Sequence, residues 1–266
     1  MLRVMTWNIR TGGRDRTGPG RLDRVVRVVT AQAPDVLALQ ELRGFDRGGL
    51  LAEVAGQVGM IPHLARSWFG QPVAVLVRPP WRTLAAGPLR RPFHHAAQRV
   101  LLATDVGSLT VLSAHLDPYT GVRRLLEAGW LAAATRRGEL ALLAGDLNTL
   151  EPGADHTERV ARLPAAYRRR HLRRDGRTVE TRAVGGLLAA GLVDLWATTG
   201  APPDEGLTAP TRHGGGAEFS GMRLDYVFGT PALAARLRSC RVVRGGDTEY
   251  ASDHYPVVAE LDLEPA

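Results

Sequence analysis

Short apolar runs of strand length recur along the whole chain, and polar side chains stand at or beside one end of most of them. They lie at residues 2–9, 35–40, 72–77, 99–106, 109–116, 140–144, 224–228, 240–244 and 256–263. Runs of this length without strict apolar–polar alternation are typical of strands that are buried on both faces. The pair Gly107-Ser108 separates two of these runs, which predicts a tight hairpin turn at that point.

Three longer segments carry apolar residues at helical spacing, at residues 22–33, 50–58 and 121–137. Gly59 and Gly138 follow the last two segments, as expected after a helix end. A loop rich in Gly, Arg and Pro is expected at residues 11–20. Because strands and helices interleave without a strict β-α-β repeat, we expect mixed sheets covered by helices. No shift in composition marks a linker, so residues 1–266 are interpreted as a single domain.

The composition is that of an ordinary globular protein. The chain has 266 residues, of which 44% are hydrophobic and 23% are charged. No apolar run approaches the roughly 20 residues that a membrane-spanning helix needs, and the N-terminal residues do not resemble a signal peptide. Cys240 is the only cysteine, so no intrachain disulfide can form. We therefore expect a cytoplasmic protein, and the sequence does not indicate its oligomeric state.

The formal net charge is +7, and all 34 basic residues are arginine. Coding by GC-rich DNA explains the arginine bias without any function, whereas an anionic partner explains it through the match of guanidinium to phosphate. Eight arginines stand between residues 162 and 182 against Asp175 and Glu180, within an Arg-rich insertion around 155–183. This segment is either a solvated helix face or an arm that contacts a phosphate-rich substrate, so nucleic acid is a candidate partner.

Polar residues suited to phosphoester chemistry stand at the ends of the apolar runs. They are Asn8, Glu41, His115, Asp117, Asp146, Asn148, Asp225, Asp253 and His254. Because strand ends at one edge of a sheet converge, we expect these side chains to meet in one site. Carboxylate and amide oxygens are hard ligands that suit Mg²⁺, with Mn²⁺ as an alternative.

Other candidate features are assigned simpler roles. The glycines at 214–216 lack the lysine of a phosphate-binding loop and are interpreted as a flexible loop. Trp7 and Tyr226 are expected to be packing residues. His94 and His95 match no motif and are expected to be surface or loop residues. The single cysteine belongs to no Cys/His cluster, which argues against a structural zinc site.

Six short motifs resemble those of one known superfamily, in the same order along the chain. They are Thr6-Trp7-Asn8, Leu39-Gln40-Glu41, Ala114-His115-Leu116, Gly145-Asp146-Leu147-Asn148, Arg223-Leu224-Asp225-Tyr226 and Ser252-Asp253-His254. Together they resemble the endonuclease/exonuclease/phosphatase (deoxyribonuclease I-like) superfamily from residue 6 to residue 254. The resemblance implies a four-layer α/β sandwich, with two mixed β-sheets packed face to face and helices outside. It also implies a divalent-metal-dependent phosphoester hydrolase.

The resemblance also implies a role for each matched residue. Glu41 would be the main metal ligand, with Asn8 beside it on metal or phosphate and Asp253 completing the metal region. Asp146 and Asn148 would orient or activate the attacking water and hold the phosphoryl group. His115 would hydrogen-bond a non-bridging phosphate oxygen, and Asp225 would pair with His254. Whether His254 or Asp146 is the general base is left open.

The substrate is not assigned by these motifs. Arg10 and Arg123 are candidate phosphate contacts, while Asp117 and Tyr119 are candidates for the pocket wall. Ile9-Arg10 and Leu42-Arg43 depart from the pattern of exonuclease III-type enzymes, which disfavours abasic-site repair. A nuclease acting on DNA or RNA, an enzyme for other phosphoesters and a non-catalytic binding protein on the same fold are the alternatives.

Overall fold

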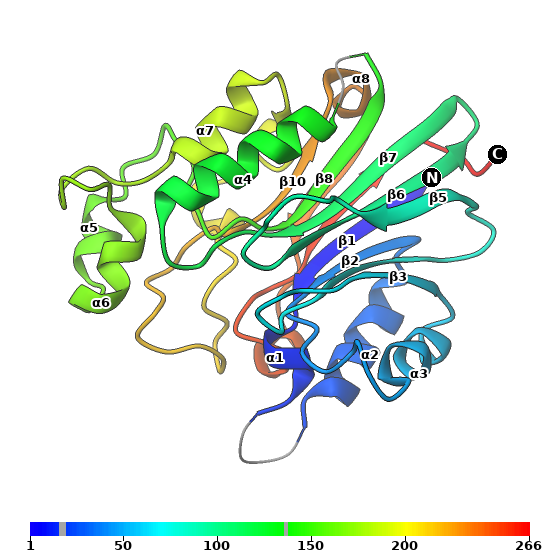
Figure 1. The fold of residues 1–266 in the computed structure, drawn as a ribbon, viewed down its shortest axis with the longest axis horizontal. Coiled ribbons are helices and arrows are strands. Elements are labelled where there is room, and N and C mark those ends of the chain that lie inside the picture. The colour runs from blue at the N-terminus through cyan, green and yellow to red at the C-terminus, as the bar shows by residue number, and fades with distance from the viewer. Residues whose placement is uncertain (16–19, 136–137) are drawn as a thin grey trace.

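Two six-stranded sheets form the centre of the computed structural model, which describes residues 1–15, 20–135 and 138–266 (Figure 1). The first sheet has the order β11 (Leu237–Val242), β12 (Val257–Leu261), β1 (Leu2–Asn8), β2 (Val36–Gln40), β4 (Val73–Val77) and β3 (Ile61–Ala65). The second has the order β5 (Thr83–Pro88), β6 (Ala96–Thr104), β7 (Gly107–His115), β8 (Leu140–Asp146), β10 (Asp225–Gly229) and β9 (Val193–Asp194). The sheets are mixed, because β1–β2 and β7–β8 pair in parallel while their other neighbours are antiparallel.

The inner faces of the two sheets pack against each other in one apolar layer. Val4 and Val36 of the first sheet belong to the same buried cluster as Val111 and Leu142 of the second. Alternate residues of the same strands face outward and are buried as well, since Met5 and Trp7 pack beneath helices. The central runs are therefore apolar on both faces, which explains why they lack strict alternation.

Helices cover the outer face of each sheet. Helices α2 (Leu22–Gln32) and α3 (Leu50–Gln57) cover the first sheet, and α4 (Gly121–Ala134) and α7 (Arg182–Ala189) cover the second (Figure 1). The remaining short elements are α1 (Arg10–Gly13), α5 (Thr157–Ala161), α6 (Ala165–Arg168), η1 (Arg169–His171), η2 (Ala197–Thr199), η3 (Pro203–Gly206), α8 (Pro231–Ala234) and α9 (Thr248–Ala251). The layers confirm the predicted four-layer α/β sandwich. In the described parts of the chain, no helix is long and apolar enough to cross a bilayer.

The predicted strands and helices are present, with shifts at several ends. The hairpin between β6 and β7 is displaced from its predicted position, because Thr104 pairs with Gly107 and the turn lies at Asp105 and Val106. The Thr104 hydroxyl donates to the carbonyl of Gly107 and accepts from the backbone N–H of Val106, which stabilises this turn. Residues 136 and 137 of the third predicted helix and residues 16–19 of the predicted N-terminal loop lie outside the described residues.

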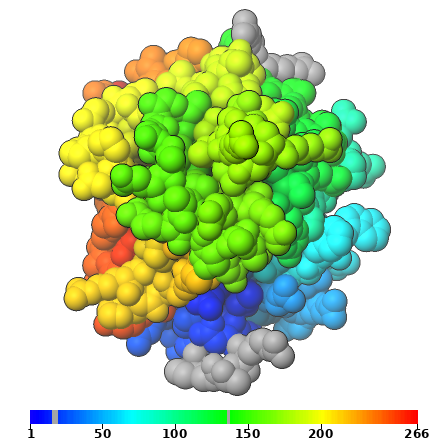
Figure 2. Space-filling model, turned by 90° about the vertical axis from the view of Figure 1, so that its left-hand side faces the viewer, coloured from blue at the N-terminus to red at the C-terminus, as the bar shows by residue number. Residues whose placement is uncertain are grey.

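The Arg-rich insertion is not one continuous helix. It consists of α5, α6 and η1 followed by irregular chain, and it forms part of the face shown in green to yellow-green in Figure 2. The fully buried guanidinium of Arg124 on α4 donates to the carbonyl oxygens of Asp117 and Arg170. This contact ties the insertion to the chain that follows β7.

Candidate active site

Strand pairing brings the polar strand ends together. Asn8 at the end of β1 pairs with Gln40 at the end of β2, so Glu41 follows directly beside Asn8. In the second sheet, Asp146 at the end of β8 pairs with both His115 and Asp225 on its two neighbours. The two sheets face each other, and their ends at this edge line one cavity of about 530 Å³.

Glu41 is held in an unusual backbone conformation by a set of donors. Its φ is 58°, a left-handed value that non-glycine residues rarely adopt. Its carboxylate accepts hydrogen bonds from Asn8 Nδ2 (3.1 Å), from the backbone N–H of Thr11 (2.9 Å) and from Gln71 Nε2 (2.9 Å). These contacts fix the carboxylate at the cavity wall.

Asn8 links the two sheets through its side-chain amide. The same Nδ2 that donates to Glu41 also donates to Asp146 Oδ2 at 2.9 Å, and its Oδ1 accepts from the backbone N–H of Arg10. Asn8 is fully buried, so this amide sets the separation of the two carboxylates.

Asp146 lies at the centre of the cluster. Its Oδ1 accepts from the backbone N–H of Asn148 at 2.8 Å, and its Oδ2 lies 3.5 Å from His115 Nε2 and 3.9 Å from His254 Nε2. Asn148 has a left-handed φ of 49° and donates its Nδ2 to the carbonyl of Leu116. Burial raises the pKa of the Asp146 carboxyl, while the His254 charge and the bond from Asn8 act in the opposite direction.

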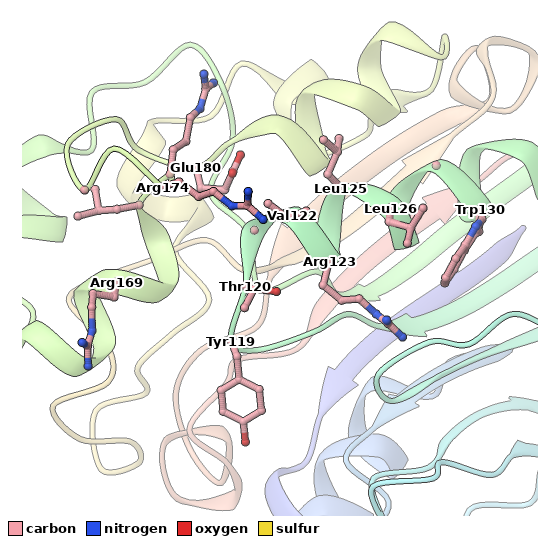
Figure 3. A pocket seen from close by; sticks show the side chains of 15 residues that line it. Tyr119, Thr120, Val122, Arg123, Leu125, Leu126, Trp130, Arg169, Arg174 and Glu180 are labelled. Carbon is pink, nitrogen blue, oxygen red and sulfur yellow. The ribbon is translucent and has the colours of Figure 1, made fainter.

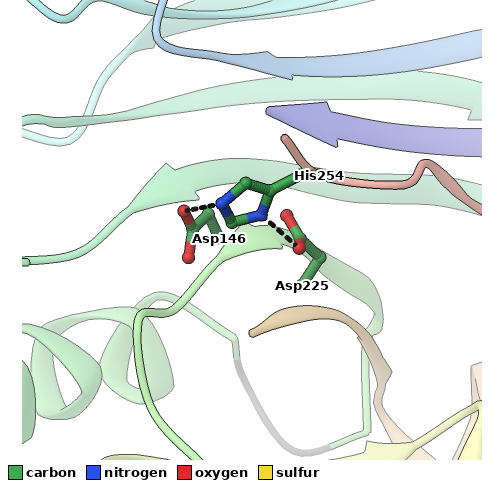
Figure 4. Close-up of side chains that lie close together, drawn as sticks. All are labelled: Asp146, Asp225 and His254. Atoms are coloured by element: carbon green, nitrogen blue, oxygen red, sulfur yellow. Dashed lines mark hydrogen bonds and ion pairs between the residues drawn. The ribbon is translucent and has the colours of Figure 1, made fainter. Parts of the chain in front are cut away.

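The two histidines beside Asp146 carry opposite pKa shifts. Burial lowers the pKa of His115 to about 3, so this imidazole is neutral at pH 7. Burial also acts to lower the pKa of His254, but the carboxylates of Asp225 and Asp146 outweigh it and raise the pKa well above 6.5. His254 Nδ1 and Asp225 Oδ2 are 2.7 Å apart (Figure 4). The site therefore holds one neutral imidazole and one imidazolium.

Asp253 is placed by its neighbour Ser252. The Ser252 hydroxyl donates to the carbonyl of Asn8 at 2.7 Å, and it lies 3.2 Å from Asp253 Oδ1. Asp253 Oδ2 is 3.6 Å from Arg10 Nε, which brings this predicted phosphate contact close to the cluster. A Cβ on Gly214 would lie 2.3 Å from the carbonyl oxygen of Ser252, so this glycine permits close packing here. That role differs from the flexible loop expected for the glycine run.

The structure brings all but one of the sequence-predicted site residues to this cluster. Arg123 does not line the cavity; its Nε pairs with Glu127 at 3.3 Å, and its Nη2 donates to the carbonyl of Pro92. Tyr119 does line the cavity, as the sequence suggested. Asp117 pairs with His94 at 3.1 Å and accepts from the backbone N–H groups of Tyr119 and Thr120.

His94 and His95 do lie in a loop, between β5 and β6, but they are not surface residues, since His95 is buried and His94 is half-buried. Both line the cavity, and the His95 ring stacks on that of His115 with centroids 4.1 Å apart. His94 stacks on Phe69 with centroids 4.4 Å apart. The two histidines stand just before β6, whose antiparallel pairing with β7 places them beside His115. In the sequence, one feature could have placed these histidines in the site. They directly precede β6, and β6 is the neighbour of β7, the strand that ends at His115.

Further residues line the cavity, and all of them except Leu224 lie outside the family motifs. They are Arg43, Phe69, Gln71, Pro118, Arg170, His171, Glu218, Phe219 and Leu224. The guanidinium of Arg170 lies over the rings of Tyr167 and Tyr119, with its carbon 4.7 Å and 5.3 Å from their centroids. Among the described residues, no carboxylate lies within ion-pair distance of Arg170. The Arg-rich insertion therefore contributes an unpaired cation to the cavity.

Comparisons with known proteins agree with the motifs and the fold. The model of the Endonuclease/Exonuclease/phosphatase family matches residues 5–254, whereas no curated protein matches the chain. An AP endonuclease from Archaeoglobus fulgidus has a TM-score of 0.74 at 20% identity, covering 98% of this chain and 100% of that one. An endonuclease/exonuclease/phosphatase from Beutenbergia cavernae DSM 12333 has a TM-score of 0.67 at 23% identity, covering 99% and 72% respectively. A truncated Caenorhabditis elegans TDP2 has a TM-score of 0.66 at 19% identity, covering 97% and 96%.

The fold and the family match define a metal-dependent phosphoester hydrolase. The chain belongs to the endonuclease/exonuclease/phosphatase family, since the family model covers most of its length. The structural likenesses, all at low identity, show the shared fold.

Proposed function

We propose that this protein is a Mg²⁺-dependent phosphoesterase, with Mn²⁺ as an alternative ion, in which Glu41 and Asp253 hold the metal. The observation that carries this proposal is the crowding of acidic groups at one end of the cavity. Glu41 acts to raise the pKa of both Asp146 and Asp253, although burial is the larger cause in each case. Carboxylates that disfavour each other's ionisation in a buried site create a demand for a cation.

The donor set fits a small hard cation. Glu41 and Asp253 offer carboxylate oxygens, and no cysteine is near. The amide nitrogen of Asn8 donates to the carboxylates of Glu41 and Asp146. We therefore assign Asn8 to positioning these two carboxylates and not to binding the metal directly. When bound, the ion would neutralise charge on the phosphate oxygens and act as a Lewis acid.

A second candidate metal group fits less well. Among the described residues, Asp146, Asp225 and His254 have ligand atoms within 4.8 Å of one another. However, His254 Nδ1 already faces Asp225, and the raised pKa of His254 makes this ring a cation. An imidazolium has no free lone pair for a metal, so we assign this group to catalysis.

The proposed chemistry divides the work among three side chains. Asp146 accepts a proton from the attacking water, because its carboxylate is buried and oriented by Asn8 and by the backbone of Asn148. As the water oxygen bonds to phosphorus, the bond from phosphorus to the leaving oxygen breaks, and that oxygen takes its proton from solvent. The His254 imidazolium donates to a phosphate oxygen and stabilises the charge that develops there. Neutral His115 donates a hydrogen bond from its Nε2–H to a second non-bridging oxygen.

Two arginines are proposed to bind the anionic substrate. Arg10 lies beside Asp253 at the metal end, and Arg170 reaches the cavity from the insertion. Arg123 is not assigned to substrate binding, because its guanidinium already contacts Glu127 and the carbonyl oxygen of Pro92 outside the cavity.

A nuclease acting on DNA or RNA is the second candidate. The net charge of +7 and the eight arginines of the segment 162–182 favour a polyanionic substrate. This candidate requires that binding weakens steeply with salt, since phosphate contacts release counterions.

A hydrolysis screen separates these candidates. Plasmid DNA, RNA, bis-p-nitrophenyl phosphate, p-nitrophenyl phosphate and inositol phosphates would be incubated with the protein in Mg²⁺, in Mn²⁺ and in a chelator. Metal-dependent cleavage of nucleic acid with steep salt dependence supports the nuclease. Turnover confined to small phosphoesters rejects it, and turnover that survives the chelator rejects the metal assignment. The variant Glu41→Gln tests the proposed metal ligand and should lose metal-dependent turnover. Glu158→Gln on α5 is the matched control and should retain it.

The cellular setting is also a proposal. We propose cytoplasmic residence, supported by a single buried cysteine that needs no oxidising compartment. We also propose that residues 1–266 act as one domain, supported by the apolar layer that the two sheets share.

A further inference from the structure

A second hollow lies beside the active-site cavity, between α4 and the Arg-rich insertion. Its volume is about 1100 Å³, roughly twice that of the catalytic cavity. One wall is the outward face of α4, and the other contains Leu172, Arg173 and Arg174. Figure 3 shows the side chains that line this hollow, which we call the α4 groove.

Helix α4 carries an apolar stripe on the side that faces the groove. Val122, Leu126 and Trp130 follow one another at intervals of four residues and therefore lie on one face. Val122 is 47% exposed and Leu126 is 50% exposed, although a separate stripe of the helix packs on the sheet. An amphipathic helix normally turns such residues inward, so an uncovered second stripe indicates a surface that meets an apolar ligand.

The rim of the groove is cationic. Arg169, Arg173 and Arg174 line it, and in the described part of the chain no carboxylate lies within ion-pair distance of these three. Glu180 is the one acidic residue in the lining, and its carboxylate is bound by Arg182. An apolar floor under unpaired guanidinium groups is complementary to an anionic amphiphile.

The groove adjoins the catalytic cavity. Tyr119 lines both, and the neighbouring residues Arg169 and Arg170 line the groove and the cavity respectively. Tyr119 therefore stands at the border between the two hollows, which a ligand would have to pass to occupy both.

We propose that the α4 groove binds the alkyl chain of an anionic phosphoester whose phosphate lies in the catalytic cavity. This inference rests on the proposed function, and it narrows the substrate to a phosphoester with an aliphatic portion. The stripe offers aliphatic side chains, and the Trp130 ring is already in edge contact with Phe93. Few free aromatic faces remain for stacked nucleobases, which a nucleic-acid strand would need.

The test is a calorimetric titration of the whole protein with butyl, octyl and decyl phosphate as monomers, and with a short oligothymidylate. We expect affinity to rise with chain length, by up to about fourfold for each methylene that the groove buries. Leu126→Ser should weaken decyl phosphate binding by about tenfold. Leu84→Ser on β5 is the control, because Leu84 lies away from the groove and its side chain is 51% exposed, against 50% for Leu126. This variant should not change the affinity for decyl phosphate. Val122→Ser provides a second groove variant.

Equal affinity for butyl and decyl phosphate would overturn the proposal. So would oligothymidylate binding that Leu126→Ser weakens while alkyl phosphate binding is unchanged, because a nucleic-acid strand would then occupy the groove. Turnover of bis-p-nitrophenyl phosphate is measured in parallel. If turnover is absent while chain-length dependence persists, the proposed function fails and the groove remains a binding site. If turnover is present without chain-length dependence, only the groove proposal fails.

Discussion

His254 Nδ1 lies 2.7 Å from Asp225 Oδ2, and only His254 of this pair lines the catalytic cavity. Asp225 is buried and contacts His254 on the side of the imidazole that faces away from the cavity. It therefore affects the substrate only through the charge and orientation of His254. The charge of Asp225 is the largest cause that raises the pKa of His254, against the opposing effect of burial. This arrangement keeps the ring protonated while its Nε2 faces Asp146 and the cavity.

Asp225→Asn should lower the pKa of His254, because the neutral amide no longer favours the imidazolium. His254 would then lose its proton at a lower pH, so the alkaline limb of the pH–rate profile should move to lower pH. At neutral pH we expect kcat to fall about 100-fold or more, as for other groups that orient a catalytic histidine.

The measurement is kcat for bis-p-nitrophenyl phosphate across the pH range, with Asp194→Asn as a control at a buried aspartate outside the cavity. A pH profile with the same shape in Asp225→Asn and in the parent would contradict the proposed role of the pair.

Glu41→Gln should weaken binding of the divalent ion by about 100-fold, since one negative charge is lost from the proposed ligand set. The variant should still fold, because glutamine has nearly the same shape and its amide oxygen can accept from Thr11 and Gln71, which donate to one and the same carboxylate oxygen. Binding of Mn²⁺ would be followed by electron paramagnetic resonance, independently of turnover. Unchanged Mn²⁺ affinity would place the metal elsewhere.

Arg124→Met should loosen the Arg-rich insertion, because the carbonyl oxygens of Asp117 and Arg170 would lose their buried donor. We expect the free energy of unfolding to fall by about 1–3 kcal/mol. Limited trypsin digestion should also cut sooner between residues 157 and 181. Equal digestion of Arg124→Met and the parent would show that other contacts hold the insertion.

Gly145→Ala should be strongly destabilising. Gly145 has a φ of 149°, and an added Cβ would lie 1.9 Å from the carbonyl oxygen of Ala114 on the neighbouring strand. Relief of this overlap must displace β8 and with it Asp146, at a cost of about 3 kcal/mol or more. Gly129→Ala on α4 has open space at its Cβ and should instead stabilise the protein by about 0.5–1 kcal/mol. Urea denaturation compares the two, and similar midpoints would contradict this packing.

His171→Phe should change how stability depends on pH. Burial, followed by the charge of Arg124, lowers the pKa of His171 to about 3 in the folded protein, against an ordinary value of 6.5. Both states hold a neutral ring above pH 6.5, whereas below it only the unfolded chain takes up the proton. The parent therefore loses stability as pH falls from about 6.5 towards 3, by up to about 1.4 kcal/mol per pH unit from this group.

The variant should lack that contribution, so its stability relative to the parent should improve as the pH falls. Urea denaturation of both proteins near pH 7 and near pH 5 measures the difference. A stability difference that is constant with pH would show that His171 titrates normally.

The positions at strand ends were predictable from sequence, and those in loops were not. Asn8 and Asp146 end apolar runs that pair in parallel with β2 and β7. His254 precedes β12, which runs antiparallel to β1, so it lies at the same edge as Asn8. Arg170 is held at the site by contacts that include the bond from Arg124 to its carbonyl oxygen, and Arg124 lies 46 residues away in the chain. No local pattern encodes such a long-range contact.

The same distinction holds within the fold. Strand β1 was predictable because it is buried on both faces, whereas β5 is mostly exposed and carries no apolar run. The hairpin was displaced because the side chain of Thr104 stabilises a turn that composition alone did not indicate.

The most direct test of the proposed active site is the Mg²⁺-dependent hydrolysis of bis-p-nitrophenyl phosphate by the parent and by His254→Ala. The proposed mechanism predicts turnover that disappears in a chelator, returns with Mg²⁺ and falls by about 100-fold or more in the variant. Turnover that is equal in the variant and the parent, or that does not respond to metal removal, would contradict it.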